Sequence, residues 1–340
     1  MSTSLRNHRI RLAARPHGEP VAEDFTHDVV EVPAPGPGEV LLRTRYLSLD
    51  PYVRGRMNDA RSYAAPMEIG DVMVGGTVSE VVESAAEGFS PGDTVLSYGG
   101  WQEFSVEPAE RLRRLDPSAA PVTTALGVLG MPGFTAYAGL LAIGKPQPGE
   151  TVAVAAATGP VGSAVGQIAR IHGARAVGIA GGEAKVARME ELGFDTALDH
   201  RAPDLTGRLA AAAPDGIDVY FENVGGAVWD AVLPQLNEFA RVPVCGLAAH
   251  YNATSLPEGP DRSGQLLGAV LSRSLTLRGF IQREFVPTMF EGFLRDMTGW
   301  LASGRVQHTE DITEGLQRAP EAFVGMLRGR NLGKAIVQVS

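Results

Sequence analysis

A turn of small residues between an apolar stretch and a helix-like stretch is the first place where residue types could do chemistry. Residues 157–162 read Ala-Thr-Gly-Pro-Val-Gly, a G-x-G-x-x-G pattern with alanine in the first position. Ala157 and Gly159 would let the backbone turn tightly and approach a pyrophosphate, and Gly162 would let the helix pack close to the strand. Because a helix N-terminus has unpaired N–H groups and the positive end of the dipole, it would face that anion. The pattern predicts a dinucleotide site, and a helix cap between ordinary strands is the alternative.

The end of the next apolar stretch indicates which dinucleotide would bind. Proteins that bind NAD usually have an acid there, which accepts a hydrogen bond from the ribose 2′-hydroxyl. This stretch ends Ile179-Ala180-Gly181-Gly182, and Lys185, His200 and Arg201 follow. Cations in place of an acid suit a 2′-phosphate, so we expect NADPH. Glu183 could still serve a ribose hydroxyl, and Lys185 alone could be a solvated helix charge.

Metal-assisted chemistry would need residues that the sequence does not offer in the usual pattern. A zinc site that activates an alcohol needs three protein ligands, usually with thiolates, and the chain has one cysteine, Cys245. The seven histidines show no H-E-x-x-H or similar pairing, although a histidine–carboxylate site stays formally possible. We expect no metal, and Cys245 is interpreted as a small residue at a strand end near the cofactor. A substrate without a metal should have its own electron sink, such as a polarised C=C bond.

Composition excludes several classes of protein. A chain of 340 residues suits two domains or one large domain. The net charge of −9 gives no sign of a nucleic-acid footprint, which would need clustered Lys and Arg. A single cysteine excludes an intrachain disulfide framework and favours a reducing compartment. No run approaches the roughly 20 apolar residues that span a bilayer. We therefore expect a cytoplasmic protein that binds neither nucleic acid nor membrane.

Two blocks of elements would position these residues. Residues 1 to about 126 are rich in strands and turns, with strands expected in 38–50 and 73–84 and a hairpin through Gly99-Gly100, which is typical of a small, mostly β domain of irregular barrel type. Residues 122–144 have near-helical spacing, broken at Pro132-Gly133. Strands and helices then alternate, which predicts an α/β fold with a doubly wound parallel sheet. The expected strands lie in 151–156, 175–180, 195–198, 216–226, 240–250 and 274–280, and the expected helices in 161–172, 183–192 and 287–303.

The end of the chain should leave this alternating block. Residues 311–340 read as one helix and one strand with no βαβ partner, so we expect them to return to the first block. The predicted domains are 1–126 plus 304–340 and 127–303.

Several further stretches carry a resemblance to one known family. LSLDPYVRGRM (47–57), MPGFTAYAGL (131–140), AAATGPVGSAVGQIAR (155–170), GIAGGEAK (178–185), FENVGG (221–226) and GRNLGK (329–334) match it in order. From residue 7 to residue 339 the chain resembles zinc-free medium-chain dehydrogenases/reductases of the prostaglandin reductase, leukotriene B4 12-hydroxydehydrogenase and alkenal double-bond reductase group, especially bacterial NADPH-dependent curcumin reductases. The resemblance implies a Rossmann domain for NADPH, a smaller GroES-like catalytic domain, and a homodimer that pairs the edge strand in 274–280.

The resemblance also implies which residues hold the cofactor. Lys185 falls on the family's lysine for the 2′-phosphate, and His200, where the family often has tyrosine, could still donate to that phosphate. Tyr251 falls on the tyrosine that hydrogen-bonds around the nicotinamide ribose. Other residues of the glycine turn, the strand ends and the loops complete the predicted cofactor-binding set: Thr135, Gly159, Pro160, Val161, Gly162, Gly181, Asn223, Cys245, Phe280 and Asn331.

Three residues are expected to meet the substrate. Tyr52 and Met131 would line its cleft, and Phe280 would lie on a loop over it. The long loop 246–268 is expected to share in setting specificity, although the sequence does not fix the substrate. The ordinary alternatives are a turn contact for Tyr52, core packing for Met131, Thr135 and Phe280, and a helix C-cap for Asn331.

The reaction that these roles imply is reduction of the C=C bond of an α,β-unsaturated aldehyde or ketone with NADPH. Hydride would add to the β-carbon, and the charge on the carbonyl oxygen would need a donor, either the ribose 2′-hydroxyl held by Tyr251 or the Tyr52 hydroxyl. The α-carbon would take a proton from Tyr251 or from water. A quinone reductase with the same fold and cofactor, and a non-catalytic NADPH-binding protein, remain the alternatives.

Overall fold

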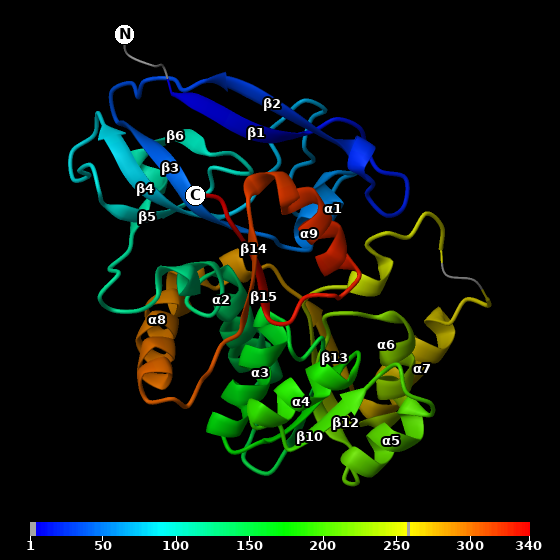
Figure 1. Ribbon diagram of the computed structural model, residues 1–340. Coiled ribbons are helices and arrows are strands. Elements are labelled where there is room, and N and C mark those ends of the chain that lie inside the picture. Colours follow the sequence, from blue (N-terminus) through cyan, green and yellow to red (C-terminus); the bar gives the residue numbers. More distant parts are fainter. Residues whose placement is uncertain (1–4, 257–258) are drawn as a thin grey trace. The chain divides into compact units, whose positions relative to one another are not determined.

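The chain divides into two compact units. In a computed structural model that describes residues 5–256 and 259–340, the first unit runs to Gly127 and resumes at Glu310–Ser340, and the second is Val128–Thr309 (Figure 1). The segment before Thr309 packs with the second unit: Val306 lies in its core, and Gln307 exchanges two hydrogen bonds with Gln167, at 2.7 and 2.9 Å. No helix in the described parts of the chain is long and apolar enough to cross a membrane.

The second unit is built on a parallel sheet. Within the described residues its six strands lie in the order β10-β9-β8-β11-β12-β13, and every neighbouring pair is parallel. The chain order reverses between β8 and β11, and in such sheets ligands bind beyond the carboxyl ends of the strands at that reversal. The predicted doubly wound sheet is confirmed. The strands are β8 Thr151–Ala155, β9 Arg175–Ala180, β10 Thr196–Asp199, β11 Ile217–Phe221, β12 Leu236–Val244 and β13 Thr276–Gly279.

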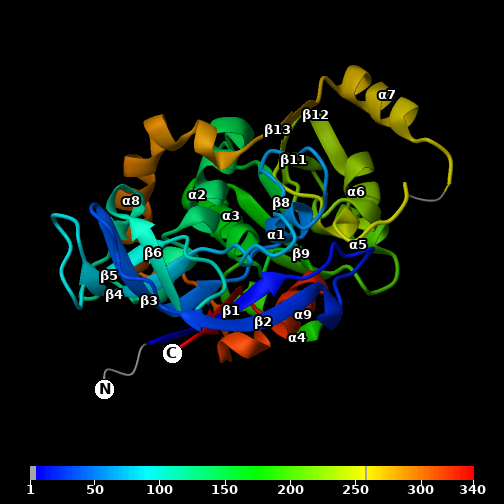
Figure 2. The same cartoon turned by 90° about the horizontal axis from the view of Figure 1, so that it is seen from above.

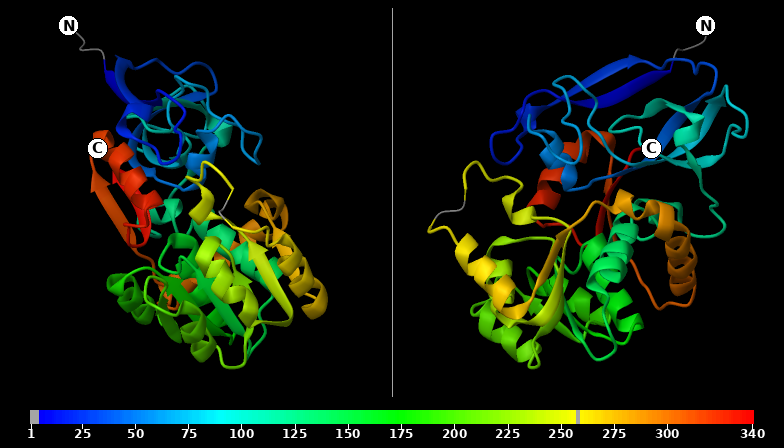
Figure 3. Two further views of the ribbon diagram at one scale, coloured as in Figure 1. Left: turned by 90° about the vertical axis from the view of Figure 1, so that its right-hand side faces the viewer. Right: turned by 180° about the vertical axis from the view of Figure 1, so that it is seen from behind.

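Helices cover both faces of this sheet because alternate strand residues point to opposite sides. Val152 and Val154 of β8 lie in one core with α2, α3, α4 and α8, whereas Ala153 and Ala155 lie in a second core with α5, α6 and α7. Figures 2 and 3 show the two groups of helices on opposite sides of the strands. The helices are α2 Met131–Ala138, α3 Pro160–Ile171, α4 Glu183–Glu191, α5 Leu205–Ala212, α6 Gly226–Val232, α7 Ser263–Arg273 and α8 Val286–Ala302.

The Pro132-Gly133 pair begins a helix, so the predicted break at this pair is wrong. Proline in the first turn of α2 loses nothing, because that N–H has no intrahelical acceptor. A Cβ on Gly133 would lie 1.9 Å from the Val128 carbonyl oxygen, so the helix start packs too closely for any side chain. The helix continues into a π-helical turn, Gly139–Gly144, which ends at Lys145 in the left-handed region (φ 47°).

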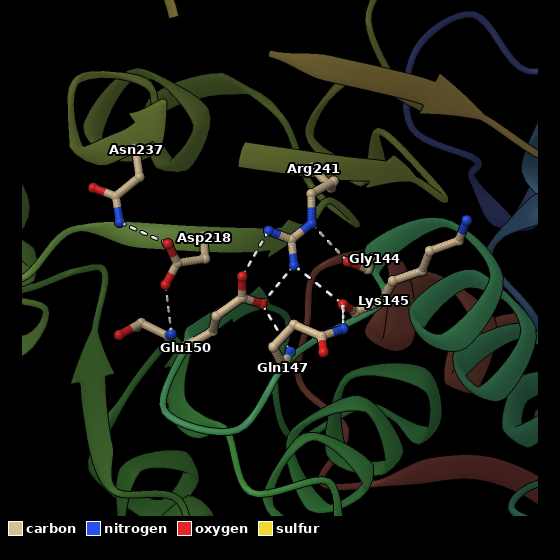
Figure 4. Close-up of polar contacts among 8 residues, drawn as sticks. Gly144, Lys145, Gln147, Glu150, Asp218, Asn237 and Arg241 are labelled. Atoms are coloured by element: carbon tan, nitrogen blue, oxygen red, sulfur yellow. Dashed lines mark hydrogen bonds and ion pairs between the residues drawn. The ribbon is translucent and has the colours of Figure 1, made fainter. Parts of the chain in front are cut away.

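A polar network fixes the amino edge of the same sheet (Figure 4). Arg241 of β12 donates to the Gly144 carbonyl at 2.9 Å and to the carboxylate of Glu150, just before β8. Burial alone would raise the pKa of Glu150, but hydrogen bonds from Arg241 and the Gln147 amide lower it. Asp218 of β11 accepts from the Thr151 amide at 2.8 Å. This network lies at the opposite ends of the strands from the glycine turn.

The first unit is mostly β, with a strand order that corrects one prediction. β5 pairs with β4 and β7, and β6 pairs with β3, so the predicted hairpin through Gly99-Gly100 is wrong. Trp101, fully buried between Phe25 and Phe323, draws the chain into the core between the two strands. The strands are β1 Arg6–Leu12 and β2 Phe25–Glu31, which pair with each other, and β3 Glu39–Ser48, β4 Thr77–Ser84, β5 Thr94–Ser97, β6 Phe104–Pro108 and β7 Arg113–Arg114.

The end of the chain adds more than the one helix and one strand that were predicted. β14 (Glu310–Glu314) precedes α9 (Ala319–Leu327) and pairs in parallel with β15 (Lys334–Gln338). β15 pairs in turn with β3. The sequence of β14 is too polar to stand out as a strand, since it reads Glu-Asp-Ile-Thr-Glu.

Candidate functional site

The glycine turn connects β8 to α3 and leaves the helix N-terminus available to an anion. Ala156 has a left-handed backbone (φ 52°), so the tight turn is made one residue before the predicted Ala157, which is buried. A Cβ on Gly162 would lie 2.4 Å from the Ala156 carbonyl oxygen, so the first turn of α3 rests directly on the turn. Gly159 is the N-cap and Pro160 follows, and no described side chain caps the helix. These features fit a pyrophosphate group.

Two basic side chains and a histidine gather where β9 and β10 end, and Lys185, His200 and Arg201 are together called the cation cluster. A Cβ on Gly181 would lie 2.7 Å from Nε2 of His200 and 2.7 Å from Nε of Arg201, so both side chains lie against this glycine. Lys185 is in the first turns of α4, close enough that its charge acts on His200. Burial and then the positive charges of Arg201 and Lys185 lower the pKa of His200. A phosphate dianion would relieve this repulsion, so the cluster fits the predicted 2′-phosphate.

Asp199 holds this cluster in place, and sequence reasoning missed it. Its Oδ1 accepts from the backbone amides of Gly182 and Arg201, both at 2.9 Å. These two bonds lower the pKa of Asp199. Gly182 has φ 97°, a conformation that glycine adopts readily. The only signal in the sequence is an acid at the end of the third strand, next to His200.

The ends of β11 and β12 bring together three more of the predicted residues. Asn223 donates to the Ala155 carbonyl at the end of β8, at 2.9 Å. A Cβ on Gly246 would lie 2.8 Å from the Tyr251 hydroxyl and 3.4 Å from the Asn223 carbonyl oxygen, so both groups lie close to Gly246. Cys245 follows β12 and packs against the apolar core. Burial, with the nearby Glu222 charge, raises the pKa of Cys245 to about 12, so this thiol is no nucleophile near neutral pH.

The predicted residues Thr135, Met131 and Phe280 are also in the second unit. Thr135 and Phe280 make contacts with other residues of that unit. The Thr135 hydroxyl donates to the Met131 carbonyl at 2.8 Å within α2. Phe280 follows β13 and packs edge-on against Phe221, with ring centroids 6.1 Å apart. Both contacts are those of core residues. The predicted specificity loop 246–268 includes Pro257 and Glu258, which lie outside the described residues.

The other two predicted residues, Tyr52 and Asn331, belong to the first unit. Tyr52 begins α1 (Tyr52–Arg56), and burial, followed by the charge of Asp50, raises its pKa. Its hydroxyl therefore stays protonated and can donate. Asn331 donates to the Gly333 carbonyl at 2.7 Å, which fixes the turn before β15.

A buried ion pair in the first unit adjoins both residues and was also missed. Lys334, the first residue of β15, donates to Asp50 at 2.9 Å and to the Leu49 carbonyl at 2.6 Å. Asp50 also accepts from Ser48 at 2.5 Å. This pair connects the segment before Tyr52 to the segment after Asn331. A lysine that begins an otherwise apolar strand is the signal in the sequence.

Comparison with known proteins identifies the family. A family model described as the N-terminal domain of oxidoreductase matches residues 8–115, and one described as zinc-binding dehydrogenase matches residues 160–298. NADPH-dependent curcumin reductase of Escherichia coli (strain K12) is 53% identical over 336 residues, which cover 98% of this chain and 97% of that protein. The chain belongs to the medium-chain dehydrogenase/reductase family.

Other members agree with the predicted group within this family of oxidoreductases. Prostaglandin reductase 1 of Bos taurus is 41% identical over 325 residues, 94% of this chain and 95% of that protein. CurA from Vibrio vulnificus, in its crystal structure in complex with NADPH, is 50% identical in sequence. The two structures superpose with a TM-score of 0.95 over 98% of this chain and 99% of that chain. The resemblance stated from the sequence is thereby confirmed. Within the described residues, no group of three or more His, Cys, Asp or Glu side chains could hold a metal ion.

Proposed function

We propose that the protein reduces the C=C bond of α,β-unsaturated aldehydes and ketones, with NADPH as its cofactor. The observation that carries the proposal is the cation cluster around Gly181 in a chain that aligns almost end to end with an NADPH-dependent curcumin reductase. When bound, NADPH supplies the hydride that adds to the β-carbon of the substrate. The turn at Gly159–Gly162 would hold the pyrophosphate, and Lys185, His200 and Arg201 would hold the 2′-phosphate.

The residues of this chain would bind and orient the cofactor and the substrate, and would supply the proton that completes the product. Asn223, Tyr251, Thr135 and Asn331 would contact the nicotinamide and its ribose. The carbonyl oxygen of the substrate gains negative charge as the β-carbon is reduced, and a protonated Tyr52 hydroxyl or a ribose hydroxyl held by Tyr251 would stabilise that charge. Tyr251 or water would then give a proton to the α-carbon, which completes the saturated carbonyl product. Met131 and Phe280 would contact the substrate.

The two units would divide this work. In the proposal the second unit binds NADPH and the first supplies Tyr52 and Asn331. We also propose that the protein is a homodimer that pairs the exposed edge strand β13 of two copies.

A panel of substrates tests the proposal. Enals, enones and quinones are each supplied with NADPH and with NADH, and the products are identified by mass spectrometry. We expect saturated carbonyls, formed faster with NADPH than with NADH. Hydroquinone products without saturated carbonyls would make the protein a quinone reductase. Tight NADPH binding with no oxidation by any substrate would make it a non-catalytic binding protein.

A further inference from the structure

Glu222 is a buried acid at the carboxyl end of β11 to which the proposed reaction gives no role. Only 2% of it is exposed, and its Oε2 has no hydrogen-bond partner among the described residues. Oε1, in contrast, accepts three hydrogen bonds, from the Val224 amide at 2.6 Å, the Gly225 amide at 2.8 Å and the Tyr220 hydroxyl at 3.1 Å. Burial raises the pKa of Glu222, and these donors partly oppose the rise. A buried acid is costly unless its contacts offset the loss of water.

The contacts of Glu222 join two neighbouring strand ends. Its carboxylate fixes the turn 223–225, which leads from β11 into α6. Its backbone carbonyl accepts from the amides of Cys245 and Gly246, at 2.9 and 3.1 Å, just after β12. A further hydrogen bond connects the same two segments, because the Ala248 amide donates to the Asn223 carbonyl at 3.1 Å. One residue thus fastens the two segments that leave the sheet at this edge.

Those two segments carry Asn223 and Tyr251, two of the four residues proposed for the nicotinamide end of the cofactor. Asn223 is the residue after Glu222, and the Tyr251 hydroxyl lies against Gly246. The cations proposed for the 2′-phosphate end follow β9 and β10 instead, and Asp199 fixes their backbone. The hydrogen bonds of Glu222 to Tyr220, Val224, Gly225, Cys245 and Gly246 all stay at the ends of β11 and β12, away from the cation cluster.

We propose that Glu222 is a positioning residue for the nicotinamide half of the site. Its Oε1 sets the 223–225 turn, its carbonyl sets the 245–246 segment, and together they hold Asn223 and the Tyr251 hydroxyl next to Gly246. The inference rests on the proposed NADPH function. It predicts that a change which draws the acceptor oxygen of Glu222 away from the Val224 and Gly225 amides weakens binding of the whole cofactor and leaves binding of its adenosine half unchanged.

Two variants distinguish the role of the Glu222 acceptor oxygen from the role of its negative charge. Glu222→Asp keeps the charge but draws the carboxylate back from the Val224 and Gly225 amides, whereas Glu222→Gln keeps an acceptor oxygen at the same length. Dissociation constants for NADPH and for adenosine 2′,5′-bisphosphate, which lacks the nicotinamide half, are measured by calorimetry. We expect Glu222→Asp to raise the NADPH constant about tenfold, as expected for loss of a hydrogen bond to a charged group. Its bisphosphate constant should not change, and Glu222→Gln should bind NADPH nearly as the unchanged protein does.

Glu150→Asp is the matched control, because Glu150 is also an acid with several donors but lies at the amino edge of the same sheet (Figure 4). It should lower the melting temperature and leave both constants unchanged. An unchanged NADPH constant in Glu222→Asp would overturn the inference, and so would equal weakening of both ligands. Failure of the unchanged protein to bind either ligand would instead overturn the proposed function.

Discussion

His200 is the residue of the cation cluster whose charge changes near neutral pH. Burial and the charges of Arg201 and Lys185, opposed in part by the charge of Asp199, lower the pKa of His200 and so favour the neutral imidazole when no anion is bound. A bound 2′-phosphate is an opposite charge and would raise this pKa. Binding of NADPH should therefore take up a proton at His200, whereas binding of NADH should not.

This proton uptake predicts a pH-dependent preference between the two cofactors. As pH falls from about 8 to about 6, the range in which histidine titrates, the preference for NADPH over NADH should grow in the unchanged protein relative to His200→Gln. Glutamine can donate a hydrogen bond but cannot become charged. The phosphate also gains a proton in this range, but it does so in both proteins and cancels in the comparison. Fluorescence titrations at each pH measure the constants, and a preference ratio between the two proteins that does not change with pH would contradict the prediction.

The role of a single residue was predictable where it follows from residue types close together in the sequence and does not depend on which strands pair. The missing acid after Ile179, together with Lys185, His200 and Arg201, led to the prediction of a cation cluster. Asp199 was not predictable, because its role depends on β10 lying beside β9 with Asp199 opposite Ala180. That register brings its carboxylate to the Gly182 amide. The role of Glu222 was not predictable for the same reason, since its hydrogen-bond partners follow two different strands, β11 and β12.

At the scale of elements, the buried pair of Lys334 and Asp50 connects β15 to the segment that follows β3. The two residues are 2% and 6% exposed. Lys334→Met removes the charge at similar length and leaves Asp50 buried without its cation, which typically costs about 3–5 kcal/mol. We therefore predict a loss of about 3 kcal/mol in the free energy of unfolding, measured by urea denaturation.

Two further variants show whether the loss of stability comes from the unpaired charge of Asp50. Adding Asp50→Asn to Lys334→Met removes the unpaired charge, so the double variant should recover part of the loss. Arg45→Met breaks the exposed Arg45–Glu80 pair in the same unit and should cost about 1 kcal/mol or less. A cost for Lys334→Met as small as that for Arg45→Met would contradict the prediction.

Elements were predictable where periodicity and local turns agree. The predicted strand 175–180 coincides with β9, and the helix 161–172 lies one residue from α3. In the first unit local signals misled, since Gly99-Gly100 is typical of a hairpin. The chain instead follows the burial of Trp101 in a core shared with Phe25 and Phe323, which lie far away in sequence. No short-range pattern contains that information.

At the scale of the whole molecule, the two edges of the Rossmann sheet are not equivalent. β10 forms one edge, and its carboxyl end leads into His200 and Arg201, so a partner there would crowd the proposed cofactor site. β13 forms the other edge and is mostly exposed. The preceding helix α7 exposes Leu267 (66%) and Leu271 (83%), which add apolar surface in the same stretch of chain. Exposed apolar side chains and an unpaired strand edge are each typical of a subunit interface.

The proposed homodimer should therefore depend on α7 as well as on β13. Sedimentation equilibrium should give a mass near twice 35.9 kDa for the unchanged protein. Leu267→Glu combined with Leu271→Glu should shift it toward the monomer, because charges buried in an interface without partners cost several kcal/mol. The fold of each subunit should persist, since both side chains are already exposed. Ile312→Glu places the same charge on an exposed residue of β14, in the other unit, and should leave the dimer intact. A dimer that withstands the α7 changes would exclude α7 from the interface, and a monomeric unchanged protein would exclude the dimer itself.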